Sequence, residues 1–413
     1  MPALVGRERG MNYPLVRNVE RALGWPGAGG PSHGFQRGHL PDPRLCARLL
    51  TPTGLLDLVM RRSLTPPQLR LLRDGTALPA EDYLDVTPTR RGQVIPMADM
   101  RRLAGHLADG CTLVLDAVQR LDPTLEVAAR AWQWRSRTAV QVNAYLTTGA
   151  NEGIAHWDDH DVLVVHLTGE KHWEVRGPSR IAPLYRDAER NVDPPDGVVW
   201  SGTVRAGDVL HLPRGHWHQA GRAGLGEGFS LHLTFGFSRP TGVDWLAWLA
   251  DQSRREVLFR GDLNLAKPEQ DREALAAAAA DLLEGHGVED FLADRESSRP
   301  PGRHVWTAGI FGPPAAVACV TDFPPRLDTT GQGPVVLTAA HRKITFARAA
   351  VPALTLLLCG EPVDIARVTA YTGIDAARLA EVLLREGVCA ELTDELFSGY
   401  TGLTTAASCS KTP

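Results

Sequence analysis

The sequence lacks the features of a membrane, secreted or nucleic-acid-wrapping protein. No apolar run approaches the roughly 20 residues that span a bilayer. The first residues, MPALVGRERGMNYPLV, lack the uninterrupted apolar core of a signal peptide. The formal net charge is -4, whereas proteins that wrap nucleic acid usually present a basic surface. We therefore predict neither a membrane nor DNA as a partner.

Paired cysteines are also missing. No two of the six cysteines form a C-x-x-C pair; they are Cys46, Cys111, Cys319, Cys359, Cys389 and Cys409. This pattern indicates reduced thiols in a cytoplasmic protein, with neither a zinc ribbon nor a disulfide framework. The 413 residues are too many for one ordinary hydrophobic core, so two or three domains are expected.

Short runs with a period of two fill residues 138–238 and are separated by Gly, Pro and Asp. In order they read TAVQVNAYL, DVLVVHL, KHWEV, GDVLHL and FSLHLTFGF. Such runs predict a mainly β core, folded as a barrel or a double-sheet jelly roll. Helical spacing is found in residues 44–73, where prolines break it, and in two amphipathic segments after Pro240.

These changes of pattern predict five parts of the chain. The last folded part orders its elements as helix, Gly turn, helix, TG turn, helix and strand, as in a winged helix. We predict a loosely held or disordered lead-in at residues 1–40 and a β domain at residues 41–242. A helical region at residues 243–295, a winged-helix domain at residues 300–395 and a tail at residues 396–413 follow.

The stretch EGIAHWDDHDVLVVHLTGEKHWEV, residues 152–175, carries candidate metal ligands. On a strand, His156 and Asp158 would point to the same side. The later segment RAGDVLHLPRGHWHQAG offers His216 and His218, and strand spacing allows either as a third ligand. Two histidines and one carboxylate form the facial triad of non-haem Fe(II) oxygenases. An H-x-D pair alone is weak evidence, and His160, which shares its spacing, is interpreted as a pocket-edge or surface residue.

Lys171 has two interpretations. Most lysines are exposed, and a strand lysine facing solvent would need no function. Gly169, however, predicts a turn just before it, and Lys171 and Trp173 then share one face of the following strand. A cation near the floor of the metal pocket would pair with the distal carboxylate of 2-oxoglutarate. Trp132, Trp134 and Trp157 could line the mouth, although core packing is the expected role for each.

QVNAYLTTGANEGIAHWDDHDVLVVHLTGEKHWEV, GDVLHLPRGHWHQA and SLHLTFGF together resemble the Jumonji-C (cupin) oxygenases, in particular the ribosomal-oxygenase branch, which hydroxylates Arg or His residues of ribosomal proteins. The core resemblance covers roughly residues 130–240 and implies a double-stranded β-helix as the catalytic domain. It implies the following roles: iron ligands His156, Asp158 and His218, a C5-carboxylate anchor at Lys171 with the hydroxyl of Thr147, and pocket residues Asn143 and Tyr145, with Tyr145 nearer the substrate.

The resemblance predicts a hydroxylase that uses Fe(II), 2-oxoglutarate and O₂ on a side chain of a ribosomal protein or another polypeptide. Relatives typically read S-L-H-L-T-x-S-T-Y where this chain reads SLHLTFGFS, so Gly236 replaces a serine that contacts substrate in that branch. The hydroxylated residue is left open by this change. Tailoring of a peptide natural product stays open as well, and demethylation is permitted but less favoured. A non-oxygenase metal cupin or a binding module is disfavoured by Lys171.

The segments after the barrel carry two further predictions. In the family these helices form a dimer, and VDWLAWLADQ supplies an apolar face with Trp245, Leu246 and Leu249 at helical spacing. We therefore expect a homodimer. In the winged helix the recognition segment, residues 374–386, carries more acidic than basic residues. Phosphates would repel it, so a scaffold or substrate-docking role is favoured over DNA binding.

Overall fold

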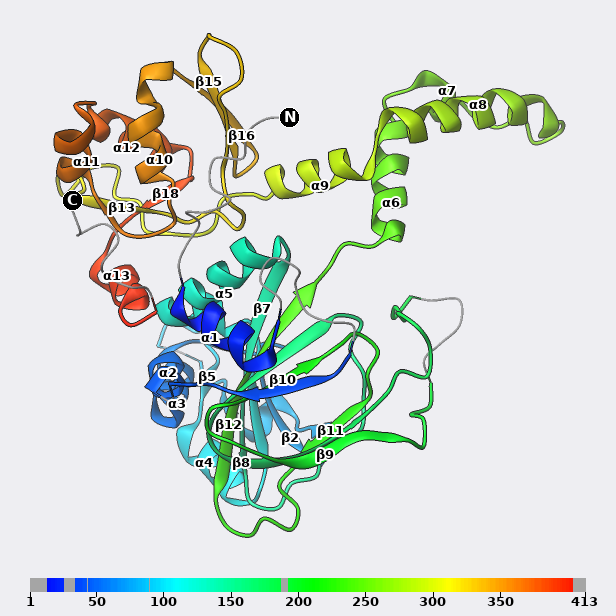
Figure 1. The fold of residues 1–413 in the computed structure, drawn as a ribbon. Helices are drawn as coiled ribbons and strands as arrows, with labels where there is room; N and C mark the ends of the chain where they lie inside the picture. The colour runs from blue at the N-terminus through cyan, green and yellow to red at the C-terminus, as the bar shows by residue number, and fades with distance from the viewer. Residues whose placement is uncertain (1–12, 26–33, 43, 89, 187–191, 404–413) are drawn as a thin grey trace.

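The computed structural model of this chain describes residues 13–25, 34–42, 44–88, 90–186 and 192–403. Over these residues ten strands form the main sheet, in the order β1-β10-β8-β12-β7-β6-β2-β3, with β9 and β11 also paired to β8 (Figure 1). The strands are β1 (Gln36–His39), β2 (Leu69–Arg73), β3 (Thr76–Ala77), β6 (Thr112–Leu115), β7 (Ala139–Thr148), β8 (Asp161–Arg176), β9 (Val198–Arg205), β10 (Asp208–Leu212), β11 (His218–Gly221) and β12 (Phe229–Ser238). The predicted mainly β core is confirmed.

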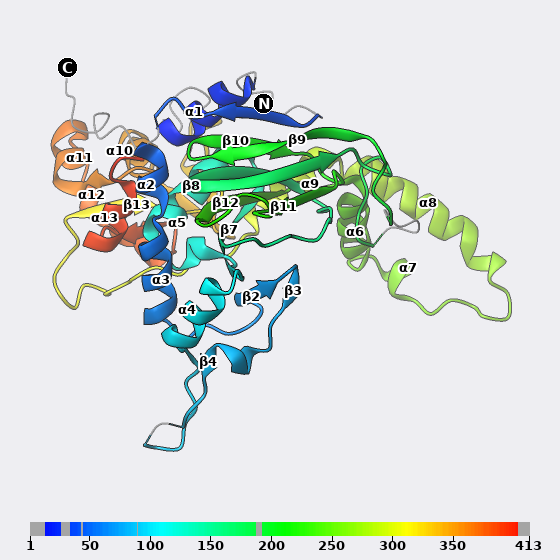
Figure 2. The ribbon, with the colours of Figure 1, turned by 90° about the horizontal axis from the view of Figure 1, so that it is seen from below.

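β8 joins two layers of this fold. Its first half pairs with β10 and β12, and its second half pairs with β9 and β11. An apolar cluster lies between the layers and comprises Val162, Val164, Trp173, Val175, Val204, Leu210 and Leu212. These residues come from β8, β9 and β10, the strands that Figure 2 shows lying side by side, so alternate positions of these strands form this part of the interior of the barrel.

Gly169 changes the face that β8 presents to the interior. Before it Val164 points inward, and after it Trp173 does, although these positions have opposite parity. The change occurs because Gly169 takes a left-handed φ of 71°, next to a register shift before His232 of β12. The predicted turn at Gly169 is therefore wrong: the strand continues through a bulge, and the bulge turns Lys171 inward.

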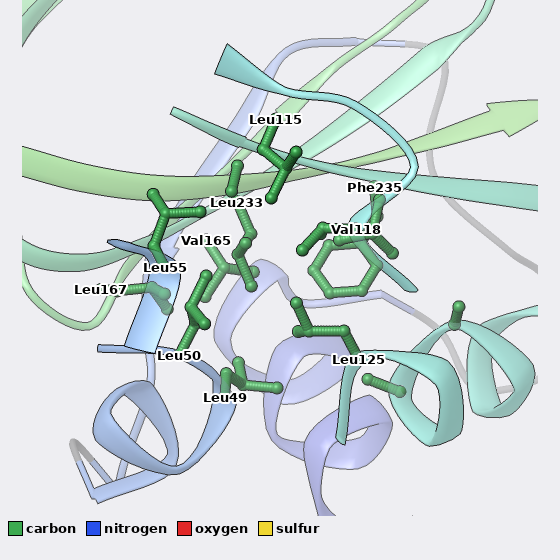
Figure 3. Packing of buried hydrophobic residues seen from close by; sticks show 14 of the residues in the cluster. Leu49, Leu50, Leu55, Leu115, Val118, Leu125, Val165, Leu167, Leu233 and Phe235 are labelled. Atoms are coloured by element: carbon green, nitrogen blue, oxygen red, sulfur yellow. The ribbon is translucent and has the colours of Figure 1, made fainter. Parts of the chain in front are cut away.

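Helices cover the outer face of the main sheet and form the main core together with it. They are α1 (Pro14–Leu23), α2 (Arg44–Leu49), α3 (Pro52–Arg61), α4 (Met100–Ala108) and α5 (Pro123–Ser136), and a small hairpin, β4 (Leu84–Asp85) with β5 (Met97–Ala98), lies beside them. Figure 3 shows leucines of α2, α3 and α5 meeting Val165, Leu233 and Phe235 of the sheet. The helical prediction for residues 44–73 holds up to residue 61. It is wrong at its end, because Leu69 and Leu71 alternate into the core as strand β2.

The described parts of the predicted lead-in differ from a loosely held segment. α1 buries Leu15, Val16, Val19 and Leu23, which are spaced to share one face of a helix. β1 pairs with β10 at one edge of the main sheet. A boundary at residue 40 is therefore wrong for these residues, since they pack in the core of the β domain. Residues 1–12 and 26–33 lie outside the described residues.

The helices after β12 form an arm that extends away from the barrel (Figure 1). They are α6 (Gly242–Ser253), α7 (Val257–Arg260), α8 (Glu269–Gly285) and α9 (Val288–Ser297). α6 begins with a capping box between Thr241 and Asp244. α8 buries none of its side chains fully, although Leu275 and Leu282 are half-buried, so this helix is only partly packed against the rest of the chain.

The C-terminal part has its own apolar core of helices and short strands. Its elements are β13 (Ala316–Cys319), β14 (Arg326–Asp328), β15 (Val335–Ala339), β16 (Arg342–Phe346), α10 (Val351–Leu357), β17 (Val363–Asp364), α11 (Ile365–Thr372), α12 (Ala376–Arg385), β18 (Cys389–Glu391) and α13 (Asp394–Tyr400). The predicted tail is wrong for residues 396–403, because Leu396, Tyr400 and Leu403 are buried in the main core. Residues 404–413 lie outside the described residues.

Candidate metal centre

A pair of backbone hydrogen bonds brings two of the predicted ligands together. The N–H of His156 donates to the carbonyl of His218 at 3.0 Å, and the N–H of His218 donates to the carbonyl of His156 at 2.8 Å. This isolated bridge is the whole of the strand structure at His156, since β8 begins only at Asp161. The prediction that His156 and Asp158 share a strand is therefore wrong, and Asp158 is reached by a loop beyond the bridge.

The bridge and the loop gather a complete donor set. One donor atom from each of His156, Asp158 and His218 lies within 4.8 Å of the others. The His218 Nε2 lies 3.7 Å from an Asp158 carboxylate oxygen. Among the described residues this is the one group of three or more such side chains close enough to hold a metal ion. His216, the rival of His218, is not in it.

Both imidazoles are oriented by backbone carbonyls. The Nδ1 of His156 lies 3.0 Å from the carbonyl of Ile154, and the Nδ1 of His218 lies 3.2 Å from the carbonyl of His216. With Nδ1 donating, each Nε2 keeps its lone pair for a metal. Burial, followed by the neighbouring charge of His156, lowers the pKa of His218 to about 4. This imidazole is therefore neutral at physiological pH, as a metal ligand must be.

Lys171 lies at the other end of the barrel interior and is only 4% exposed. Its Nζ donates to the hydroxyl of Thr147 at 3.0 Å, and that hydroxyl lies 3.0 Å from the hydroxyl of Thr112. Burial, with a smaller contribution from the charge of Arg222, lowers the pKa of Lys171 to about 7. Lys171 and Arg222 have no carboxylate partner among the residues described here. Two buried cations without a counter-ion favour binding of an anion.

Aromatic rings fill the interior between the two ends. Tyr145 stacks on His232 with ring centres 4.9 Å apart, and His232 stacks on His166 at 6.1 Å. Burial first, and then the charge of Lys171, lowers the pKa of His166 to about 4 and lowers that of His232 as well. Both rings are therefore neutral, and Trp173 continues the packing to His218 with ring centres 6.0 Å apart.

Some residues beside Lys171 were not selected from the sequence. The hydroxyl of Ser230 and the Nδ1 atoms of His166 and His232 are buried without a hydrogen-bond partner in the described structure. Ser230 is in register with Thr147 across the β12–β7 pair. In the sequence SLHLT, Ser230 and His232 are two residues apart and so point to the same side of the strand. This alternation could have indicated both as polar residues of the interior. Such unpaired polar atoms are expected where a polar ligand binds.

Asn143 and Tyr145 lie on β7 as predicted. The Asn143 Oδ1 accepts from the N–H of Ala117 and from the amide of Gln141, each at 3.0 Å. Its side chain thus braces the wall, which is a positional role. Burial, with the charges of Asp116 and Asp158, raises the pKa of Tyr145 to about 12. Tyr145 therefore remains a neutral phenol within the electrostatic field of the metal centre.

Tyr185 is a further residue that sequence reasoning missed. Its hydroxyl donates to the carbonyl of Trp157 at 3.0 Å and approaches an Asp158 oxygen at 3.5 Å. The rings of Tyr185 and Trp157 lie 4.7 Å apart, at the mouth of the site. The other tryptophans follow the packing interpretation: Trp132 is buried in the main core, and the Trp134 indole bonds to the Thr321 carbonyl.

Comparison with known proteins gives one family and several relatives. Residues 119–245 match the family described as JmjC domain. Ribosomal oxygenase 1 of Gallus gallus is 33% identical over 130 residues, which are 30% of this chain and 21% of that protein. The bifunctional lysine-specific demethylase and histidyl-hydroxylase NO66 of Caenorhabditis briggsae is 29% identical over 171 residues, 40% of this chain and 21% of that protein.

The fold has a match along most of the chain. The structure of YcfD, a ribosomal oxygenase from Escherichia coli, in complex with cobalt and succinic acid covers 92% of this chain and 99% of that chain, with a TM-score of 0.50 and 15% sequence identity. At this identity the likeness concerns the fold. This chain spans about a fifth of the length of the curated relatives named above. The predicted Jumonji-C resemblance is confirmed, and the matched segment contains all the candidate site residues.

Proposed function

We propose that this protein is an Fe(II)- and 2-oxoglutarate-dependent oxygenase that hydroxylates a side chain, of the Arg or His type, in a ribosomal protein or another polypeptide. The observation that carries the proposal is the pairing of two features inside one JmjC barrel. One is the two-histidine, one-carboxylate group at the mouth. The other is the buried Lys171, which donates to Thr147 and has no carboxylate partner among the described residues.

The residues present fit both cofactors. Nitrogen from two imidazoles and oxygen from a carboxylate suit Fe(II) and leave other positions open. The Lys171 ammonium and the Thr147 hydroxyl suit a carboxylate at the inner end. When bound, iron, 2-oxoglutarate and O₂ supply hydroxylation of a C–H bond, coupled to conversion of 2-oxoglutarate into succinate and CO₂. A non-oxygenase cupin would have no use for a buried lysine without a counter-ion.

The chain's own side chains then have distinct tasks. His156, Asp158 and His218 would hold the metal. The two imidazole rings, each oriented by a backbone carbonyl, would fix its position. Lys171 would neutralise and orient the inner carboxylate of the co-substrate. Tyr145, on the wall between these ends, would exclude water and border the substrate, because its ring is stacked on His232 and cannot move freely.

The names of the relatives bear on the substrate. The Gallus gallus relative is called a ribosomal oxygenase, and the Caenorhabditis briggsae relative is called a demethylase and a histidyl-hydroxylase. These names favour a polypeptide substrate and hydroxylation of a ribosomal protein in particular. They keep demethylation as a second outcome that the same triad could support.

The direct test uses purified protein with Fe(II), 2-oxoglutarate, O₂ and proteins extracted from bacterial ribosomes. We expect one of these proteins to gain the mass of a single oxygen atom, with an equal amount of succinate. Asp158→Ala should give neither product. Succinate formation without any modified protein, peptide or methyl loss would contradict the proposed substrate class. Absence of both products with the parent protein would contradict the proposed chemistry.

A homodimer through the arm is part of the proposal. Leu246 on α6 is 54% exposed, and Val257, Leu258 and Leu265, on and after α7, are exposed as well. A hollow of about 840 Å³ lies between α7 and α8. Exposed apolar surface of this kind is usually covered by a partner. Leu249, one of the residues predicted at the dimer interface, is however only 6% exposed. It therefore packs within its own chain. Light scattering that gives a monomer mass at micromolar concentration would contradict the dimer.

We also propose that the C-terminal elements form a winged helix that borders the substrate route without reading DNA. The order α10, β17, α11, α12 and β18 supports this proposal. On α12 and its flanks Asp375 and Glu381 are exposed, as are Arg378 and Arg385, so the surface has no basic excess. Tight, salt-sensitive binding to duplex DNA would contradict this role.

Within the described residues no helix is both long and apolar enough to cross a membrane.

A further inference from the structure

Gly236 lies in the interior of β12, where a glycine weakens a strand and so needs a reason. Its φ is outside the left-handed region, so backbone freedom is not the reason. The reason is lack of space, because a Cβ added at Gly236 would lie 2.8 Å from the Nε2 and 2.9 Å from the Cδ2 of His160. The next nearest atom, the carbonyl oxygen of Gln141, would be at an ordinary 3.9 Å. The glycine therefore makes room for one imidazole.

His160 is positioned at the mouth of the site. Its Nδ1 lies 3.2 Å from an oxygen of Asp159, and its side chain is 32% exposed. It lies two residues beyond Asp158 and directly before the start of β8 at Asp161. The ring is thus held on one edge by Asp159, rests on Gly236, and remains accessible near the metal centre. The sequence had allowed a pocket-edge or a surface position for this residue, and the contact with Gly236 favours the pocket edge.

Gly236 and His160 also belong to the wall that leads inward. Gly236 is in register with Gln141 of β7 and Val162 of β8. From Gln141 the same face of β7 continues through Asn143 and Tyr145 to Thr147. His160 is partly exposed at this end of the wall and is therefore available to a side chain that enters toward the metal.

We propose that His160, seated on Gly236, is a specificity-determining residue that contacts the target side chain of the polypeptide substrate. This inference rests on the proposed function. A partly exposed imidazole whose Nδ1 is held by Asp159 favours a planar partner that can stack or form a hydrogen bond, such as a guanidinium or an imidazole. The bulk of His160 also narrows the opening, which disfavours a branched apolar target.

The first test is a double-mutant cycle on thermal stability, and it needs no substrate. Gly236→Ala should lower Tm, because the new methyl group meets the imidazole. In a His160→Ala background Gly236→Ala should lower Tm little or not at all, because the imidazole that the methyl group would meet is absent. Gly242→Ala is the control, because a Cβ there would have nothing within 4 Å. Equal losses of Tm from Gly236→Ala in both backgrounds would overturn the steric coupling and the inference with it.

The second test measures substrate choice with proteins extracted from bacterial ribosomes. His160→Ala should lower kcat/KM for the modified protein by about tenfold or more, or change which residue is modified. Its affinities for Mn(II) and 2-oxoglutarate should match those of the parent. His172→Ala is the control, since His172 bonds Ser201 on the outside of the barrel and is exposed.

The outcomes separate the inference from the proposed function. A parent protein that modifies nothing in the extract would overturn both. A parent that modifies one protein, with His160→Ala giving the same rate and the same residue, would overturn the inference alone. Loss of Mn(II) or 2-oxoglutarate binding in His160→Ala would also overturn it, because the role would then be at the metal centre and not at the substrate.

Discussion

Lys171 and Thr147 stand on long strands inside the barrel, whereas His156 and Asp158 stand on a loop at its mouth. The inner pair is placed by strand register and by the bulge at Gly169. The outer pair is placed by one isolated bridge and by short contacts to backbone carbonyls. The inner end is buried and the outer end is partly exposed.

This difference predicts where changes will be felt. A change at the inner end should alter co-substrate binding and stability together, because the same strands carry both. A change at the outer end should alter metal binding with little effect on stability, because a partly exposed loop contributes less packing.

The largest effect is expected at the mouth. Asp158→Ala removes the only carboxylate of the donor group and should abolish most stoichiometric Fe(II) or Mn(II) binding, while Tm without metal stays close to that of the parent. Metal titration and thermal melts measure this. Asp109→Ala, an exposed aspartate far from the site in sequence, is the control. Parent-like metal binding by Asp158→Ala would show the ligand assignment to be wrong.

At the inner end, Lys171→Ala should weaken 2-oxoglutarate binding without loss of metal. Removing one partner of a desolvated charge pair commonly costs about 2–5 kcal/mol, or about 30-fold or more in affinity. Calorimetric titration of 2-oxoglutarate measures the effect, and the exposed strand residue Lys343 supplies a matched lysine-to-alanine control. An unchanged affinity would contradict the anchor role.

The inner end should also make co-substrate binding depend on pH. Burial lowers the pKa of Lys171 to about 7 in the site without ligand, and a bound carboxylate would raise it again. Above pH 7 binding therefore requires uptake of a proton, and affinity should fall by up to about tenfold per pH unit. Lys171→Arg should flatten this dependence, since guanidinium stays charged. A flat profile in the parent protein would contradict the account.

Gly169→Ala should affect both stability and the co-substrate. A Cβ there would lie 1.9 Å from the carbonyl oxygen of Phe229, and the residue has a φ of 71°. Strained backbone of this kind costs about 1–3 kcal/mol, and relief by slippage would turn Lys171 away. Denaturant melts and 2-oxoglutarate titration measure the two effects. Gly177→Ala, just beyond the same strand with open space around it, should show neither.

The smallest effect is expected from Tyr185→Phe. The hydroxyl is 3.5 Å from Asp158 and the side chain is 58% exposed, so its loss should weaken metal binding by about tenfold at most. Tm should change little. Tyr371→Phe, at an exposed tyrosine of the C-terminal part, is the control. A loss as large as that of Asp158→Ala would show that the loop carrying Tyr185 does more than orient the carboxylate.

Period-two patterning was enough to predict the strands that carry Lys171, Thr147 and Tyr145, because side chains on one face of a strand must alternate. The family resemblance then selected His218 over His216, which spacing alone could not do. The two ends of the site differ in the same way, because the inner end lies on strands and the outer end lies on a loop. What lies on long strands was predictable, and what lies on the loop was identified only as a motif.

The misses have physical causes that a single sequence conceals. Gly169 reads equally as a turn or a bulge, because both need a left-handed glycine. Tyr185 reaches Asp158 from a loop with no periodic pattern. The helix α1 looked like part of a Gly- and Pro-rich lead-in because only ten residues of it carry apolar spacing. The pairing of Gly236 with His160 joins positions 76 residues apart, and only the β12–β8 register brings them together.

The central claim is that the mouth and the inner end serve one ligand, and calorimetric titration of 2-oxoglutarate with and without Mn(II), in the absence of O₂, tests it most directly. We predict that Mn(II) strengthens 2-oxoglutarate binding to the parent protein, and that the strengthening disappears in Asp158→Ala while the weak metal-independent binding through Lys171 remains. Identical 2-oxoglutarate affinity with and without Mn(II) in the parent would contradict the account, because the two ends would then bind their ligands separately.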